Sequence, residues 1–113
     1  MNMTLQEKQS IFAQNVARLI DHIFATGFTC SLGEVLRTAE QAALYAKEGK
    51  GIADSQHCKK LAIDIQFFDS NGKYLSEPEH YVEAGKYWES LHPDNRSGMH
   101  FKRVDANHFE MMG

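Results

Sequence analysis

The sequence has little of what marks several common classes of protein. Only two of its 113 residues are cysteine, Cys30 and Cys58, which is too few for a disulfide scaffold, so we expect two small buried thiols. No apolar run approaches the roughly 20 residues that a membrane-spanning helix needs. The first ten residues are polar and lack the apolar core of a secretory signal, so we expect synthesis in the cytoplasm.

An excess of positive charge is also absent. The formal net charge is −3, and no stretch concentrates Lys and Arg on one face, which argues against binding to nucleic acid through its phosphates. Hydrophobic residues make up 42% of the chain and charged residues 24%, a balance that argues against disorder. The length fits one domain over residues 1–113, and we expect that domain to be a monomer.

Apolar periodicity predicts three helices. Thr4-Leu5-Gln6-Glu7 has the form of a capping box, and the apolar stripe after it predicts a helix that ends at Gly27. We interpret residues 1–27 as a packing helix in front of a core of residues 28–112. A second helix is predicted from Thr38 to Glu48, and a third begins at residues 76–79.

Alternating apolar residues predict a small sheet. The alternation from Lys60 to Phe68 is typical of a strand, and the turn signal at residues 69–72 lets residues 73–75 return as its partner. Residues 107–112 predict a further short strand. The expected class is therefore α+β, with helices packed on a small, mainly antiparallel sheet.

One charged residue interrupts the predicted strand. Asp64 lies among apolar neighbours, and an ionised carboxylate on a half-buried strand is unfavourable unless it is paired or bound to a cation. His57 lies just before this strand, in a loop able to fold back toward it. Imidazole nitrogen and carboxylate oxygen both bind Zn²⁺ at about 2.0–2.2 Å, so the two residues indicate a candidate metal site.

A second polar cluster, Asp105-Ala106-Asn107-His108-Phe109-Glu110, lies near the C-terminus. His108 would supply a third ligand to one zinc ion, and Asp105 would lie beside the metal without binding it. Three protein ligands with one position left for water are common in catalytic zinc sites, and a nearby carboxylate can take the proton of that water. Glu110 would accept the spare N–H of a ligand histidine, or form an unrelated salt bridge.

Each of these signals has a plain structural alternative. A lone histidine near a strand is more often a structural residue, and an aspartate before a strand is often part of a turn. The combination favours a metal, because a single ion would account for several otherwise unfavourable residues at once. Cys58 adjoins His57, but adjacent residues of a strand point in opposite directions, so we do not expect it to be a ligand.

The arrangement resembles a known family of enzymes. Over about residues 28 to 112, the matching features are Ser55-x-His57, Ala62-x-Asp64, a Tyr-rich helix ending in Trp88-Glu89, and Asp105-x-x-His108-Phe109-Glu110. They resemble the zinc D-alanyl-D-alanine carboxypeptidase family, which shares its fold with hedgehog-like domains. The family includes vancomycin-resistance-type D,D-peptidases and phage endolysins that cleave between L-alanine and D-glutamate. The resemblance implies that His57, Asp64 and His108 bind zinc and that Asp105 is the catalytic base, with aspartate there closer to the endolysin branch.

A third cluster, Arg37-Thr38-Ala39-Glu40-Gln41, also resembles the endolysin branch. The resemblance implies that Arg37 projects into the cleft, where a guanidinium can pair with the oxyanion of the attacked carbonyl or with a substrate carboxylate. The alternative is a surface ion pair at a helix end. Gln41 would bind the substrate backbone or stay solvated, and Ser55 would contact the substrate or orient the His57 loop.

These expectations combine into a functional hypothesis. The first reading is a zinc peptidase that hydrolyses peptidoglycan stem peptides, in the manner of an L-alanyl-D-glutamate endopeptidase of a phage or prophage. Such an endolysin acts on the wall after a separate phage protein releases it from the cytoplasm. A D-alanyl-D-alanine carboxypeptidase or dipeptidase is the second reading. The third, from another class, is a non-catalytic domain that keeps zinc as a structural or binding device.

Overall fold

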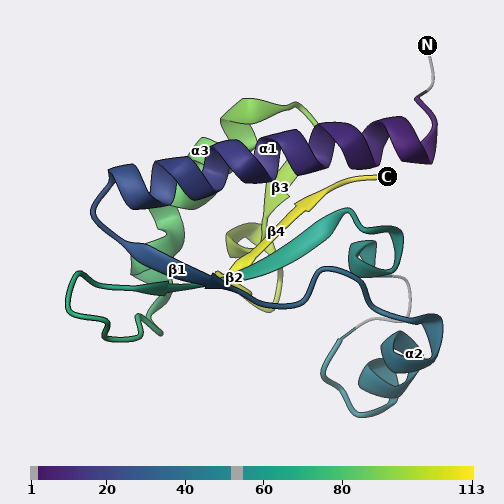
Figure 1. Cartoon of the computed structure of the whole chain (residues 1–113). Coiled ribbons are helices and arrows are strands. Elements are labelled where there is room, and N and C mark those ends of the chain that lie inside the picture. Colours follow the sequence, from purple (N-terminus) through teal and green to yellow (C-terminus); the bar gives the residue numbers. More distant parts are fainter. Residues whose placement is uncertain (1–2, 52–54) are drawn as a thin grey trace.

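The computed structural model describes residues 3–51 and 55–113, and in these residues it shows an α+β fold. Four strands form one sheet in the order β1-β2-β4-β3, with every neighbouring pair antiparallel. Figure 1 shows α1 crossing one face of this sheet, while α2 lies apart from it. The predicted fold class is therefore confirmed. The described elements are α1 (Leu5–Ala25), β1 (Thr29–Leu32), α2 (Ala39–Lys47), β2 (Ala62–Phe68), α3 (Val82–Leu91), β3 (Asn95–Ser97) and β4 (His108–Met111), with short 3₁₀ helices η1 (Gln56–Lys59), η2 (Pro78–Tyr81) and η3 (Gly98–His100).

The first helix, α1, begins at the predicted cap. The Thr4 hydroxyl accepts a hydrogen bond from the Glu7 N–H at 3.1 Å, and the Glu7 carboxylate accepts one from the Thr4 N–H at 3.0 Å. The helix ends at Ala25, two residues before the predicted end, and Gly27 then turns the chain with φ +96°. The helix packs against α3 and β1 and so closes one side of the core.

The other two predicted helices are also present. The Thr38 hydroxyl caps α2 by accepting the Gln41 N–H at 3.1 Å, and Gly49, at φ +74°, lies just beyond its end. The third helix opens as the 3₁₀ turn η2, which has its proline in the first position and continues into α3.

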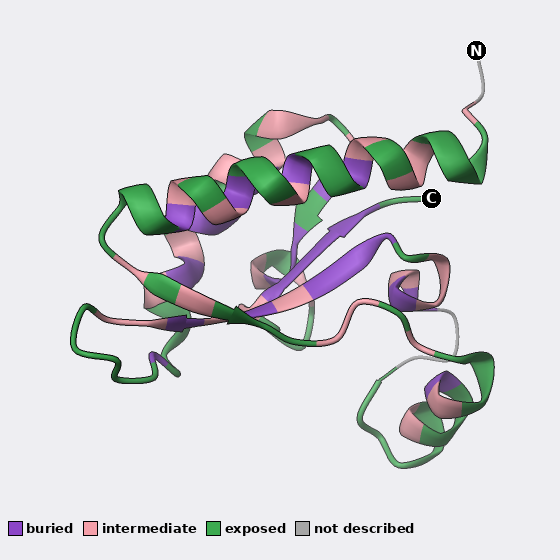
Figure 2. Cartoon of the chain, viewed as in Figure 1, coloured by how far each residue is buried: buried purple, intermediate pink, exposed green. Residues whose placement is uncertain are grey.

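The core lies between the sheet and helices α1 and α3, where Figure 2 shows the buried residues. In β2, Ile63, Ile65 and Phe67 are buried on the core side, and the alternation of the strand turns Asp64 to the opposite face. Trp88 of α3 is fully buried, and its indole N–H donates to a carbonyl of β4 at 2.9 Å. The packing that fixes β2 and β4 therefore also fixes the face that carries Asp64.

The pairing of the sheet differs from the predicted pairing. Residues 73–75 return antiparallel beside the end of β2, but only as an isolated bridge from Tyr74 to Phe68, with the Leu75 N–H donating to the Phe67 carbonyl and the Asp69 N–H donating to the Lys73 carbonyl, both at 2.9 Å. The opposite edge of β2 pairs with β1, which the sequence does not predict, in a register that places Thr29 opposite Phe68. The sequence predicts neither β1 nor β3, because both are very short and largely polar or exposed, which leaves no alternation to read.

Two expectations that rested on what the sequence lacks have different outcomes. Cys30 and Cys58 are free thiols, as expected, but both are half-buried, so the expectation that they are buried is wrong. None of the helices in residues 3–51 and 55–113 combines the length and the apolar character that crossing a bilayer requires.

Candidate metal centre

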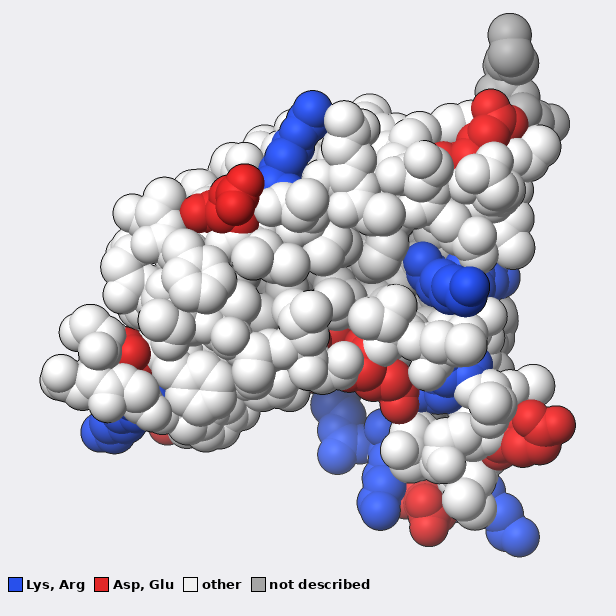
Figure 3. Space-filling model, in the orientation of Figure 1, with Lys and Arg blue, Asp and Glu red and all other residues white. Residues whose placement is uncertain are grey.

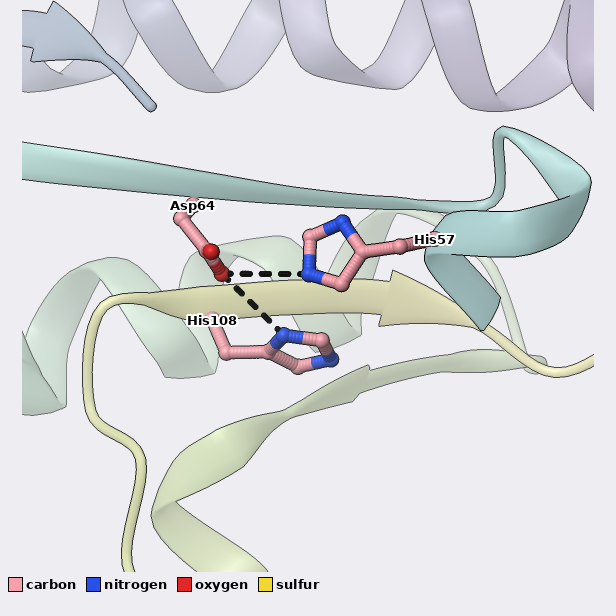
Figure 4. A group of neighbouring side chains, drawn as sticks. All are labelled: His57, Asp64 and His108. Carbon is pink, nitrogen blue, oxygen red and sulfur yellow. Dashed lines mark hydrogen bonds and ion pairs between the residues drawn. The ribbon is translucent and has the colours of Figure 1, made fainter. Parts of the chain in front are cut away.

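Three side chains from three elements point toward one another on the face of the sheet away from α1 (Figure 4). Asp64 lies on β2 and His108 on β4, and the antiparallel register places these two residues directly opposite each other. Opposed residues of an antiparallel pair project to the same face with their Cβ atoms close together. His57 joins them from η1, which precedes β2. The β2–β4 pairing and η1 therefore bring together the three residues that the sequence predicts as metal ligands.

Local hydrogen bonds fix His57 above the strand. The Ser55 hydroxyl accepts the His57 N–H at 3.1 Å, and the His57 carbonyl accepts the Arg37 N–H at 3.2 Å. Lys60 then adopts a left-handed conformation, φ 56°, which turns the chain from η1 into β2. As a result, His57 is only 1% exposed.

The distance of Asp64 from each of the two histidines suits a tetrahedral zinc ion. His57 Nε2 lies 3.4 Å from Asp64 Oδ1, and His108 Nδ1 lies 3.2 Å from the same oxygen. One ligand atom from each residue lies within 4.8 Å of the others. Bonds of 2.0–2.2 Å in a tetrahedron separate neighbouring ligand atoms by about 3.3–3.6 Å, and two imidazoles with one carboxylate form a known donor set for zinc. The residues present therefore fit the ion.

Each histidine uses its second ring nitrogen for a different partner. The Nδ1–H of His57 donates to the Val35 carbonyl at 3.1 Å, and the Nε2–H of His108 donates to Glu110 Oε1 at 2.7 Å. Such bonds fix the tautomer and orientation of an imidazole and direct its other nitrogen to a metal. Both rings thus present their remaining nitrogen to Asp64.

The electrostatics of the cluster favour positive charge. Burial opposes ionisation of Asp64, but the hydrogen bonds to His108 and His57 outweigh it and lower the pKa of this carboxyl to about 2. Burial likewise opposes protonation of His108, yet its bonds to Asp64 and Glu110 raise its pKa to about 9. The ionised carboxylates of Asp64 and Glu110, on either side of His108, therefore favour positive charge at the His108 side chain.

Asp105 lies beside the three residues without joining them. Its Oδ2 atom is 3.9 Å from His108 Nδ1, and its side chain is half exposed. Burial raises the pKa of this carboxyl, and the charge of Asp64 adds to the effect, although His108 opposes it. The backbone holds the residue on both sides, because the Asp105 N–H donates to Gly98 and the Asp105 carbonyl accepts the His108 N–H.

A cavity of about 660 Å³ opens over the cluster. Its described walls include His57, Asp64, Asp105 and His108, together with cationic side chains from four segments of the chain. These cationic residues are Arg37, Lys50, Arg96 and Arg103. In Figure 3, charged side chains of both signs gather at the lower right, beside and over α2. The cavity thus offers several cations to an anionic ligand close to the candidate metal site.

The three remaining predicted site residues lie in different settings. Arg37 lines the cavity and its Nε pairs with Glu34, but its side chain is only 12% exposed, so this is not the surface ion pair of the alternative reading; its predicted role toward the substrate stays a prediction. Ser55 lines the cavity too, with its hydroxyl engaged by the His57 N–H. Gln41 is not among the described residues that line the cavity, and its predicted contact with substrate stays a prediction.

Several contributors to the site are not evident from the sequence. The sequence cannot identify the Val35 carbonyl as a partner of His57, because any residue type offers the same backbone acceptor. Arg96 lies opposite Glu110 in the β3–β4 register and pairs with its carboxylate, but this pairing requires a strand that the sequence does not predict. Lys50 and Arg103 line the cavity from loops whose positions depend on the tertiary fold.

Comparison with known proteins supports the fold. No protein-family model and no curated protein matches the sequence. The crystal structure of the L-Ala D-Glu endopeptidase ChiX of Serratia marcescens matches this structure with a TM-score of 0.69. The match covers 88% of this chain and 79% of that chain at 18% sequence identity. At this identity the likeness shows a shared fold, and the chemistry must be argued from the residues themselves.

Proposed function

We propose that this protein is a zinc-dependent peptidase that hydrolyses a peptide bond in the stem peptides of bacterial peptidoglycan. The observation that carries the proposal is the convergence of His57, Asp64 and His108, with one ligand atom from each within 4.8 Å of the others. Two further observations support it. The fold is shared with an L-Ala D-Glu endopeptidase, and a carboxylate suited to act as a base, Asp105, lies at the edge of the cluster.

The residues of the site suit the steps of peptide hydrolysis. A zinc ion held by His57, Asp64 and His108 would supply Lewis acidity and a water of lowered pKa. Asp105 would accept a proton from the attacking water and pass it to the leaving amine, a task for which a carboxyl of raised pKa is suited. Arg37 offers further guanidinium N–H donors to the oxyanion or to a substrate carboxylate. Val35 and Glu110 keep the two imidazoles oriented.

The finer proposal is an L-alanyl-D-glutamate endopeptidase of the endolysin branch of the zinc D-alanyl-D-alanine carboxypeptidase family. Its support is the Asp105-x-x-His108 motif and the structural likeness to ChiX. Besides three carboxylates, the cavity wall carries four cationic side chains, which suit a substrate that carries carboxylates, as stem peptides do. A role in host lysis, with release from the cytoplasm by a separate phage protein, is part of the same proposal.

Hydrolysis of purified peptidoglycan, with and without a chelator, tests the proposal. We expect products with new L-alanine carboxyl and D-glutamate amino ends, identified by mass spectrometry. Chelation should stop their formation, and added zinc should restore it, because the candidate centre would hold the ion through three side chains of the described residues. Released D-alanine would instead identify a carboxypeptidase or dipeptidase. A zinc-loaded protein that forms no products would be a non-catalytic domain.

Gly98 gives a second prediction for the same site. A Cβ atom at this position would overlap the Asp105 carbonyl oxygen and lie 3.0 Å from the Cβ atom of His108. Gly98→Ala should therefore displace both residues and lower the hydrolysis rate by about 10²-fold, the effect expected of a displacement of roughly 1 Å in an active site. Turnover and thermal unfolding of the variant measure this. Gly85→Ala is the control, because its Cβ would also approach a neighbour too closely, the Ser97 Oγ atom at 2.7 Å, but at a position that is not among the described residues lining the cavity; an equal loss in both variants would contradict the explanation.

A further inference from the structure

Glu110 links His108 to a residue beyond the candidate metal centre. Its side chain is almost wholly buried, at 5% exposed, and both of its oxygens are engaged. Oε1 accepts the His108 Nε2–H at 2.7 Å, and Oε2 accepts a hydrogen bond from Arg96 Nη2, also at 2.7 Å. Arg96 reaches this oxygen because β3 and β4 pair antiparallel with Arg96 directly opposite Glu110. The carboxylate therefore lies between the imidazole and the guanidinium.

Phe101 makes a second connection between the same residues. The Phe101 ring centroid lies 5.2 Å from that of His108, and the guanidinium carbon of Arg96 lies 5.0 Å from the centroid of Phe101. A guanidinium at this distance from an aromatic face is attracted to it. Arg96 thus contacts two of the side chains that contact the His108 ring, Glu110 and Phe101.

A plain surface ion pair does not account for this arrangement. Exposed pairs contribute little, but here only Arg96 reaches solvent, with its side chain 46% exposed against 5% for Glu110. Removal of Arg96 would leave one oxygen of a buried carboxylate without its donor, which is costly. The carboxylate would then turn away from its present position to find another partner, and the His108 N–H would lose its fixed acceptor.

We propose that Arg96 is a positioning residue for the metal centre, acting through Glu110 and Phe101 to make His108 present its Nδ1 atom to the ion. This inference rests on the proposed zinc site. A positioning role can be distinguished from a purely electrostatic effect of Arg96, because the two predict opposite changes in zinc affinity when Arg96 is removed. Removal of a nearby positive charge should strengthen the binding of a cation, whereas removal of a positioning residue should weaken it.

The test is the zinc affinity of the metal-free protein, measured by competition with a chromogenic chelator. For Arg96→Ala we expect zinc binding about tenfold weaker, at the lower end of the range for partners outside the ligand set. Arg103→Ala is the matched control, since Arg103 also lines the cavity but donates to the Gly49 carbonyl at 2.8 Å rather than to Glu110. Its zinc affinity should stay unchanged or rise.

A double-variant comparison shows whether Arg96 acts through Glu110. In a Glu110→Gln background, the further change Arg96→Ala should have little additional effect on zinc affinity, because the link is already broken. Cobalt-substituted protein provides a spectroscopic readout: Arg96→Ala should alter the visible absorption of the bound cobalt, and Arg103→Ala should not. Arg96→Lys, which keeps a positive charge beside Glu110, should retain part of the affinity and serves if the alanine variant does not fold.

The possible results separate this inference from the proposed function. Zinc binding by folded Arg96→Ala as tight as that of the unaltered protein, or tighter, would overturn the positioning role and leave the metal centre standing, and so would a loss in Arg96→Lys no larger than the loss in Arg103→Ala if the alanine variant does not fold. Equal losses in Arg96→Ala and Arg103→Ala, or fully additive effects of the changes at Arg96 and Glu110, would overturn it too. Failure of the unaltered protein to bind zinc would overturn the proposed function, and this inference with it.

Discussion

Replacing His57 with alanine is expected to abolish zinc binding and peptidoglycan hydrolysis together. His57 Nε2 lies 3.4 Å from Asp64 Oδ1, and both atoms would bind the same ion. Among the described residues, the candidate centre offers two other protein ligands, Asp64 and His108. The loss of zinc affinity should exceed the 10- to 100-fold that changes outside a ligand set typically cause. Metal content after dialysis, determined by mass spectrometry alongside turnover of purified peptidoglycan, measures both effects.

His22→Ala provides the control for this experiment. His22 lies on α1, where it stacks on Tyr87 and pairs with Glu83, in a part of the molecule that does not line the cavity. This variant should keep one zinc ion per chain and full turnover. Because His57 is buried, circular dichroism of the metal-free variants should accompany the assay to show that both remain folded. A folded His57→Ala protein that retains zinc and activity would remove the residue from the ligand set.

The second large effect is expected at Asp105, where zinc binding and catalysis should separate. Asp105→Asn should retain zinc, because the carboxylate lies beside the ligand set and 3.9 Å from His108 Nδ1. Turnover should fall by about 10²–10⁴-fold, the usual contribution of a general base. An amide of the same shape cannot accept the proton from water, so the loss would report the missing base. Turnover and metal content measured on one preparation test this.

Asp105→Glu is the matched variant, because it keeps a carboxylate at the position. It should recover a substantial part of the activity that Asp105→Asn loses, with unchanged zinc content. An Asp105→Asn protein that hydrolyses peptidoglycan at the rate of the unaltered protein would refute the assigned base. Loss of zinc from this variant would show that Asp105 supports metal binding, so that its role could not be confined to proton transfer.

Much of the fold follows from local sequence patterns. The cap at Thr4 and the apolar stripe after it specify α1, and strict alternation specifies β2 with Asp64 on the face opposite the core. Local patterns predict the pairing of the strands less well. The four residues of β1 and the three of β3 contain too little periodicity to identify, and their pairing depends on contacts between distant parts of the chain. Residues 73–75 are the partner for β2 that the sequence predicts, because a clear turn signal at residues 69–72 precedes them.

The candidate site, like the fold, could be predicted from the sequence only in part. Asp64 and His57 stand out because a charge in an apolar strand calls for a partner, and His108 belongs to a recognisable motif. Their convergence depends on the register that sets Asp64 opposite His108, which no periodicity reveals. Contacts made by backbone atoms or by unpredicted strands, such as those of Val35 and Arg96, could not be anticipated.

X-ray absorption spectroscopy of the zinc-loaded protein tests the central claim most directly, since it reports the atoms bound to the ion. The account predicts one zinc ion per chain with only nitrogen and oxygen neighbours at about 2.0–2.2 Å, and the multiple-scattering signature of two imidazoles. Asp64→Ala should alter this spectrum or remove the metal. A sulfur neighbour at about 2.3 Å, which would indicate Cys58 or Cys30, or a spectrum without imidazole scattering, would contradict the assignment of His57, Asp64 and His108.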